Sequence, residues 1–297
     1  MDQVKVSYCI LTYNQEDYIE ETINAAFAQT YSPMEIIISD DGSTDNTFEI
    51  VKRKVAEYKG PNNIIINQNN PNLGLREHYN KVWYELSHGE YLIMADGDDV
   101  SIPTRVEDYV NFFERFPEVV MISSKSVETD SNLKPLYPDD EWDGSFSINT
   151  INDYIDNRNW YIHSSDSRGL RRNVIDAFPP LKFPFAEDLA CFLRALLIGS
   201  ECYIQKGYVH RRHHELNSSK ARLTEEMAYR SILQMEADVD LALQKGLLTE
   251  KKAQAVRDKF LFSIKFITTY SAPFYSSLRV FIFKVLSRFF KLTISRL

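Results

Sequence analysis

The stretch YLIMADGDDV, residues 91–100, passes from a run of mostly apolar residues into three carboxylates, Asp96, Asp98 and Asp99, separated only by Gly97. The apolar run predicts a strand buried on both faces, as in a parallel sheet that helices cover. Three like charges at the end of a buried strand repel one another. A divalent cation such as Mg²⁺ or Mn²⁺, which prefers oxygen ligands, relieves that repulsion. An acidic turn exposed to solvent is the alternative for this segment taken alone.

Outward from this strand, segments with strand and helix periodicity alternate along the first half of the chain. Strands are predicted over Val4–Leu11, Glu35–Ser39, Asn63–Asn67, Tyr91–Ala95 and Val119–Val127. Helices are predicted around Ile19–Phe27, over Thr47–Tyr58 and Leu75–His88, from Pro103 onward, and within Leu181–Gly199. Such alternation predicts an α/β fold with a doubly wound, mostly parallel sheet, whose ligand crevice lies beyond the carboxyl ends of the strands. Beyond Lys220 the pattern is helical, so we expect one domain over residues 1–220 and a helical extension over 221–297.

Composition narrows the class of protein. The chain has 297 residues, enough to bury a full core, and a formal net charge of -8, which argues against a general nucleic-acid binder. Cys9, Cys191 and Cys202 are too few and too scattered for a disulfide framework, so we expect a reducing, cytoplasmic compartment. The N-terminal residues MDQVKVSYCIL are typical of a strand rather than a signal peptide. No apolar run approaches the roughly 20 residues that span a bilayer.

Two further candidate sites fall where predicted strands end or helices begin. In IIISDDGSTDNT, Asp40 and Asp41 follow the second strand, where a carboxylate can accept a hydrogen bond from a nucleobase N–H. An ordinary Asp-Gly turn with a helix cap from Ser43 or Asp45 is the alternative.

The other candidate site is NPNLGLREHYN, which approaches a helix through Gly74. Arg76 and Asn80 share one face of that helix, and a helix N-terminus with an arginine in its first turn suits a diphosphate. A routine helix start with a solvated arginine is the alternative.

Taken in chain order, these segments resemble the inverting glycosyltransferases of the family-two type, which have the A-type nucleotide-sugar fold and include many bacterial surface-polysaccharide enzymes. The matching segments are VSYCILTYNQEDYIEETINAAFAQTY, IIISDDGSTDNT, NLGLREHYN and YLIMADGDDVSIP, and they cover the first third of the chain. The resemblance implies a nucleoside-diphosphate-sugar donor and Mn²⁺ or Mg²⁺ as cofactor. In that family pattern Asp96 and Asp98 form the acidic DXD signature, with Asp98 as the direct metal ligand and Asp99 assisting.

The resemblance assigns donor binding to Thr12, Tyr13, Asn14, Asp40, Asp41, Gly74, Arg76, Asn80, Asp96 and Arg212. Thr12 and Tyr13, together with Asp41, would hold the base and ribose. Arg212 comes from YVHRRHHELNSS, which is similar to a family segment with Arg, His, Asn and Ser at fixed offsets, here Arg212, His214, Asn217 and Ser219. In this segment Arg212 would neutralise the leaving diphosphate and His214 would complete the metal sphere. The extra histidines 210 and 213 depart from the pattern, and solvated loop histidines are the alternative.

The segment FAEDLACFLRAL resembles the acidic pair of the same family, in which the second carboxylate is the general base. This match makes Asp188 the base and Glu187 its support. An inverting transfer needs an ionised carboxylate facing an acceptor hydroxyl, and a helix N-terminus favours the ionised form. A charged helix start in solvent is the alternative.

Two segments suggest contacts with the acceptor or a membrane. Trp160 or Tyr161 could stack on a sugar face, although core packing is the more common role. Residues 274–297 contain five basic residues and no acid, with apolar residues roughly opposite the basic ones. This pattern fits an interfacial helix on anionic lipid, or a helix that packs on its own domain or on a second subunit of a homo-oligomer.

The sequence therefore predicts a metal-dependent inverting glycosyltransferase. It would move a sugar from its nucleotide donor to a hydroxyl of a lipid-linked saccharide acceptor, in surface polysaccharide or lipopolysaccharide synthesis. The enzyme would act in the cytoplasm, peripherally at the inner membrane. Two alternatives stay open: transfer to a polyprenyl phosphate, and a non-catalytic protein that binds nucleotide sugars or acts as a membrane scaffold.

Overall fold

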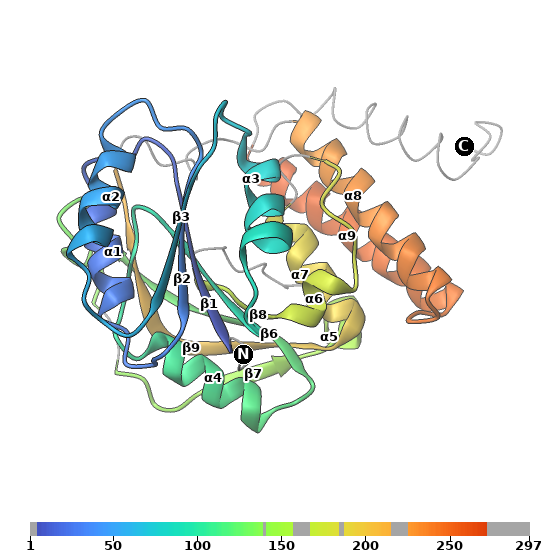
Figure 1. Cartoon of the computed structure of the whole chain (residues 1–297). Coiled ribbons are helices and arrows are strands. Elements are labelled where there is room, and N and C mark those ends of the chain that lie inside the picture. The colour runs from blue at the N-terminus through green and yellow to red at the C-terminus, as the bar shows by residue number, and fades with distance from the viewer. Residues whose placement is uncertain (1–4, 139–140, 157–166, 184–186, 215–224, 272–297) are drawn as a thin grey trace.

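A nine-stranded mixed sheet forms the centre of the computed structural model, which describes residues 5–138, 141–156, 167–183, 187–214 and 225–271 (Figure 1). The strands are β1 (Val6–Thr12), β2 (Glu35–Asp40), β3 (Asn63–Gln68), β4 (Tyr91–Asp96), β5 (Val100–Ser101), β6 (Val119–Thr129), β7 (Phe146–Asn149), β8 (Gly169–Arg171) and β9 (Ser200–Arg212). Their order is β3-β2-β1-β4-β8-β6-β9-β5, and β7 also pairs with β9.

The first four strands in this order are parallel, as the sequence predicts. Every residue of β1 and β2 is buried, which explains their continuous apolar character. Beyond β4 the sheet becomes mixed, because β8 runs antiparallel to both β4 and β6. β8 has three residues and β5 has two, which is too short for periodicity to indicate a strand.

Helices cover both faces of the sheet (Figure 1). They are α1 (Ile19–Phe27), α2 (Thr47–Glu57), α3 (Leu75–Lys81), α4 (Arg105–Arg115), α5 (Ile151–Asp156), α6 (Arg172–Asp176), α7 (Glu187–Ile198), α8 (Glu225–Gln244) and α9 (Glu250–Ser271). Residues 82–86 continue α3 as a turn of π-helix, η1 (Val82–Leu86), so the helix predicted over Leu75–His88 is not α-helical throughout. The helix expected from Pro103 onward begins at Arg105.

Two apolar clusters lie on opposite faces of the sheet. Alternating side chains of β1 divide between them: Tyr8 and Ile10 pack with α1, α2 and α4, whereas Cys9 and Leu11 pack with α3, η1, α6 and α7. Each fully buried aliphatic side chain contributes about 1.5–3 kcal/mol to folding. The alternation of buried side chains therefore fixes the pairing register of β1 with its neighbours, and this register sets the positions of the polar residues at the strand ends.

Helix α8 packs on α7, and α9 packs on α8 and α5 (Figure 1). A third apolar cluster, which includes Leu193 of α7, Val239 of α8 and Val256 of α9, joins the three helices. The helical C-terminal part is thus confirmed, and its boundary at residues 220 and 221 stays a prediction. None of the helices within the described ranges combines the length and apolar character needed to cross a membrane. Residues 274–297 lie outside the described residues.

Candidate functional site

The carboxyl ends of β1, β2 and β4 meet at one edge of the sheet. Thr12 lies opposite Asp40, and Leu11 lies opposite Asp96. The first residue after β2 and the first residue after β4 each bind the backbone of β1. The Asp41 amide donates to the Thr12 carbonyl and the Gly97 amide to the Leu11 carbonyl, both at 2.9 Å. Two of the candidate sites, far apart in the sequence, therefore share this edge.

Asp41 holds the third candidate segment, which contains Gly74, beside the ends of β1 and β2. Its Oδ1 accepts hydrogen bonds from the Asn69 side chain at 2.8 Å and the Leu73 amide at 2.9 Å, and its Oδ2 accepts one from the Gly74 amide at 2.9 Å. Gly74 has a φ of 78°, which favours glycine. The described bonds of this carboxylate hold the loop before α3, and its contact with a nucleobase stays a prediction.

Asp40 is fully buried, and its carboxylate accepts bonds from the Ser43 amide at 3.0 Å and the Gln68 side chain at 3.2 Å. Ser43 Oγ in turn accepts the Asn14 amide at 2.8 Å, so the turn after β2 is tied to the turn after β1. Beside it the Tyr13 side chain is 47% exposed. Of the residues at these two turns that the sequence assigns to the donor, Tyr13 presents the largest accessible surface.

The acidic segment after β4 is organised by residues from the end of β9 and beyond. His214 Nε2 lies 2.8 Å from Asp98 Oδ2, and Asp99 Oδ1 accepts the Arg212 amide at 2.8 Å. Gly97 is required here by close approach, because a Cβ at this position would lie 2.6 Å from Thr12 Oγ1. The structure thus places His214 beside Asp98, as the family pattern implies.

Arg212 is buried beneath the same segment. Its Nε donates to the Asp98 carbonyl and its Nη1 to the Ser131 carbonyl, both at 2.9 Å, and its Nη2 pairs with Glu21. The guanidinium also lies 4.7 Å from the Tyr18 ring centre. These contacts make Arg212 a brace for the acidic segment, and its contact with a diphosphate stays a prediction.

The chemistry of these donors suits a hard divalent cation shared with a substrate. Among the described residues, no group of three or more His, Cys, Asp or Glu side chains is arranged to hold a metal ion by itself. Mg²⁺ and similar ions are commonly held by one or two carboxylates together with substrate phosphates, so a complete protein cage is not needed. Asp96 and Asp98 have carboxylates of this kind, and the roles of Asp96, Asp98, Asp99 and His214 as metal ligands stay predictions.

Asp188 lies in the first turn of α7 with 41% of its side chain exposed. Arg168 Nη2 lies 3.2 Å from Asp188 Oδ1, and the Arg168 side chain is fully buried. Burial opposes the charge on Arg168, yet Asp188 and neighbouring groups raise its pKa above the usual value, so Asp188 faces a permanent cation. The sequence pattern assigned no role to Arg168 and gave no sign of this contact, which joins residues 20 apart in the chain.

Tyr79 of α3 is influenced by both acidic groups. Burial raises the pKa of its hydroxyl well above the usual value, the carboxylates of Asp96, Asp188 and Glu187 raise it further, and Arg168 opposes them. Arg168 also links the two groups directly, because its carbonyl accepts the Met94 amide of β4 at 2.9 Å while its side chain contacts Asp188. The acidic segment after β4 and the start of α7 therefore lie in the same part of the fold.

Arg76 and Asn80 point from α3 toward residues 181–182. Arg76 Nη1 contacts the Lys182 carbonyl, Asn80 Oδ1 accepts the Leu181 amide at 2.8 Å, and Asn80 Nδ2 donates to the Leu181 carbonyl at 3.0 Å. Their described contacts join α3 to the segment that leads to α7. Their roles at the donor stay predictions. Trp160, Tyr161, Asn217 and Ser219 lie outside the described residues.

Buried His78 should make the folding stability depend on pH. Burial lowers its pKa from 6.5, against the opposing effect of Asp41 and Asp40, and its Nε2 lies 2.8 Å from Ser39 Oγ. Since the unfolded chain then binds protons more readily than the folded chain, stability is full above pH 6.5 and falls as the pH drops below it. Urea unfolding from pH 7.5 to 5.5 should show this loss. The loss should be smaller in His78→Gln, and equal slopes in the two proteins would contradict the assignment.

Comparison with known proteins places the chain among sugar transferases. The model of the family described as "Glycosyl transferase family 2" matches residues 7–178. A curated relative, UDP-Glc:alpha-D-GlcNAc-diphosphoundecaprenol beta-1,3-glucosyltransferase WfaP of Escherichia coli, is 33% identical over 125 residues, which cover 42% of this chain and 47% of that protein. The chain spans less than half the length of the first curated relatives that it matches.

Two solved structures share the fold. TarS from S. aureus in complex with UDP-GlcNAc has a TM-score of 0.72 at 20% identity and covers 97% of this chain and 81% of that chain. Mannosyltransferase PcManGT from Pyrobaculum calidifontis, in complex with GDP-Man and Mn2+, has a TM-score of 0.57 at 15% identity and covers 96% and 81%. The predicted nucleotide-sugar transferase fold is thus confirmed.

Proposed function

We propose that this chain, a glycosyltransferase that belongs to glycosyl transferase family 2, moves a sugar with inversion from a nucleoside-diphosphate donor to a saccharide hydroxyl. One observation carries the proposal. Arg168 joins the two acidic segments: its Nη2 lies 3.2 Å from Asp188 Oδ1 at the start of α7. Its carbonyl accepts the amide of Met94, two residues before Asp96 on β4, at 2.9 Å. Carboxylates on two sides of one site suit a reaction in which one side holds the leaving group and the other activates the nucleophile.

On the acceptor side, Asp188 takes the proton of the attacking hydroxyl as the new glycosidic bond forms. Arg168 holds one carboxylate oxygen, which leaves the other oriented toward the acceptor. A base fixed in this way approaches the hydroxyl in a single geometry, and attack from its side of the sugar gives inversion at the anomeric carbon.

On the donor side, Asp98 and Asp96, with His214, would hold Mn²⁺ or Mg²⁺. The bound ion would offset the negative charge that develops on the departing nucleoside diphosphate. Arg212 and Gly97 keep the acidic segment in place from below, through the Asp98 carbonyl and the close approach to Thr12. Support for such an ion comes from the donor chemistry and from the Mn2+ in the mannosyltransferase PcManGT.

The acceptor proposal is a saccharide linked to a lipid diphosphate, in surface polysaccharide synthesis. The name of the relative WfaP, which acts on a sugar linked to diphosphoundecaprenol, supports this class of acceptor. A contact of residues 274–297 with the membrane would bring the enzyme to such an acceptor, and it rests on the sequence pattern alone.

A thermal-shift panel of nucleoside diphosphates and nucleoside-diphosphate sugars, with and without Mn²⁺, tests the donor and the ion together. A ligand at a hundred times its Kd adds about 2.7 kcal/mol to the unfolding free energy. For a protein of this size that raises the Tm by about 4 °C. We expect a rise of this size for one base class, and only when the metal is present. No response to any nucleotide would contradict the donor assignment, and an equal response in EDTA would contradict the shared ion.

A further inference from the structure

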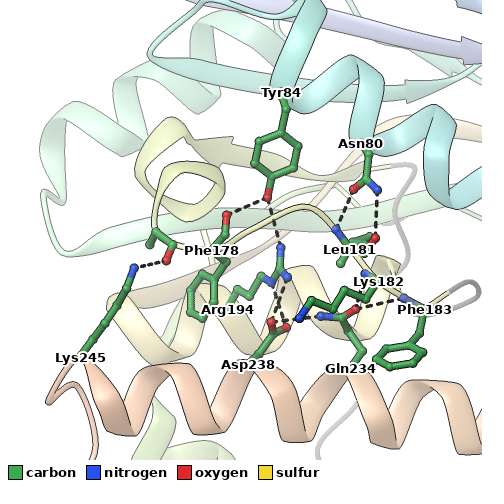
Figure 2. Close-up of polar contacts among 11 residues, drawn as sticks. Asn80, Tyr84, Phe178, Leu181, Lys182, Phe183, Arg194, Gln234, Asp238 and Lys245 are labelled. Atoms are coloured by element: carbon green, nitrogen blue, oxygen red, sulfur yellow. Dashed lines mark hydrogen bonds and ion pairs between the residues drawn. The ribbon is translucent and has the colours of Figure 1, made fainter.

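Two polar side chains of α8, Gln234 and Asp238, are buried one helical turn apart (Figure 2). Gln234 Nε2 donates to Asp238 Oδ1 at 3.1 Å, so the pair is a single unit on one face of the helix. Apolar packing already joins α7, α8 and α9 through the third cluster. The packing of α8 on α7 therefore does not require buried polar groups. Such groups cost free energy unless their hydrogen bonds are made in a defined geometry.

Asp238 holds the helix that carries Asp188. Arg194 of α7 donates to it from Nε and from Nη2, both at 2.9 Å, in a two-point contact that fixes direction as well as distance (Figure 2). Arg194 lies six residues after Asp188 on α7. At 1.5 Å per residue, Asp238 therefore holds α7 about 9 Å along its axis from Asp188.

Gln234 holds the segment that leads into α7. Its Oε1 accepts the Lys182 amide at 2.9 Å and the Phe183 amide at 3.3 Å. Asn80 of α3 binds the same segment from the other side, through both backbone groups of Leu181 (Figure 2). Residues 181–183 are thus fixed between α3, which carries Tyr79, and α8.

We propose that Gln234 and Asp238 are positioning residues, through which the helical extension sets Asp188 in line with the donor. This inference rests on the proposed role of Asp188 as the base. The pair holds both the helix of Asp188 and the chain before it, so movement of either one would displace the carboxylate. A displacement of about 1 Å can cost on the order of a hundredfold in rate, and we expect donor binding at the ends of β1, β2 and β4 to be retained.

Gln234→Met tests the proposal, because it keeps the volume and removes both hydrogen-bonding functions. The matched control is Gln244→Met, an exposed glutamine at the end of the same helix. We expect kcat to fall at least about tenfold in Gln234→Met while the donor KM stays within about threefold. Hydrogen exchange at the Lys182 and Phe183 amides should accelerate in the same variant. An unchanged kcat, or a rise in donor KM that accounts for the whole loss, would overturn the proposal.

A charge-exchange variant separates positioning from damage to the fold. Gln234→Glu alone sets two carboxylates side by side, and Asp238→Asn alone leaves Arg194 without its carboxylate. The double variant Q234E/D238N again has one carboxylate and one amide, with an acceptor at position 234 for the two backbone amides. We expect its kcat to exceed that of both single variants and to stay below that of the original chain, because Arg194 does not regain its two-point contact at position 238. A double variant no better than either single variant would overturn the pairing. If the original chain itself transfers no sugar, the proposed function fails instead, and the amide exchange still reports on the contact.

Discussion

The Asp188→Asn variant is expected to lose about a thousandfold or more in kcat, because general base catalysis contributes about 10²–10⁴-fold and an amide cannot take the acceptor's proton. The replacement is nearly isosteric, and its side-chain oxygen can still accept the hydrogen bond from Arg168. Binding of the nucleoside diphosphate should change little, since the donor candidates Thr12, Asp40 and Asp96 lie at the ends of β1, β2 and β4 and keep their charges and contacts in this variant. Initial rates over a range of acceptor concentrations, together with a nucleotide-binding isotherm, measure both effects.

Asp176→Asn is the matched control for this variant. Asp176 is an exposed carboxylate at the end of α6, 12 residues before Asp188, and Asp176→Asn should leave kcat unchanged. Full activity in Asp188→Asn would refute the base assignment. It would instead favour transfer to a phosphate acceptor such as polyprenyl phosphate, since a phosphate oxygen is already ionised and needs no base.

The sequence predicted the sheet edge well for a physical reason. β1, β2 and β4 are buried on both faces, so each contains a run of four or more mostly apolar residues that polar residues follow at once. Parallel strands end at the same edge, and adjacency of Thr12, Asp40 and Asp96 follows from that rule. β8 could not be predicted in the same way, because its three residues take their place from the antiparallel partners β4 and β6.

The contacts that organise the site were not predictable from spacing. Arg168 reaches Asp188, Arg212 reaches Glu21 and Ser131, and Gln234 reaches Lys182, all across long separations in the sequence. A sequence motif identifies a carboxylate by its neighbours in the chain. A residue that holds this carboxylate in place is identified only by the contacts that the fold creates. The buried contacts of Arg168 and Arg212 are therefore visible only in the fold, and the donor role predicted for Arg212 stays a prediction.

The Asp98→Asn variant is expected to lower kcat/KM for the donor by about 10²–10³-fold and to raise the Mn²⁺ concentration needed for half-maximal rate. The physical reason is that an amide lacks the charge that would hold the ion, and an ion at a phosphoryl oxygen contributes several kcal/mol to the transition state. Rates measured against Mn²⁺ concentration at fixed donor give the effect. Asp17→Asn, an exposed carboxylate of the turn before α1, is the control and should leave the metal dependence unchanged.

Asp98 also contacts His214, so a loss of activity by itself could reflect a displaced loop. The two explanations differ in their dependence on metal. If Asp98 only anchors His214, the variant unfolds more easily, and the Mn²⁺ concentration for half-maximal rate stays at the original value. If Asp98 binds the ion, excess Mn²⁺ recovers part of the rate, and the metal-dependent rise in Tm with nucleotide shrinks. An unaltered metal requirement would therefore remove Asp98 from the ion and leave Asp96 as the carboxylate of that site to test.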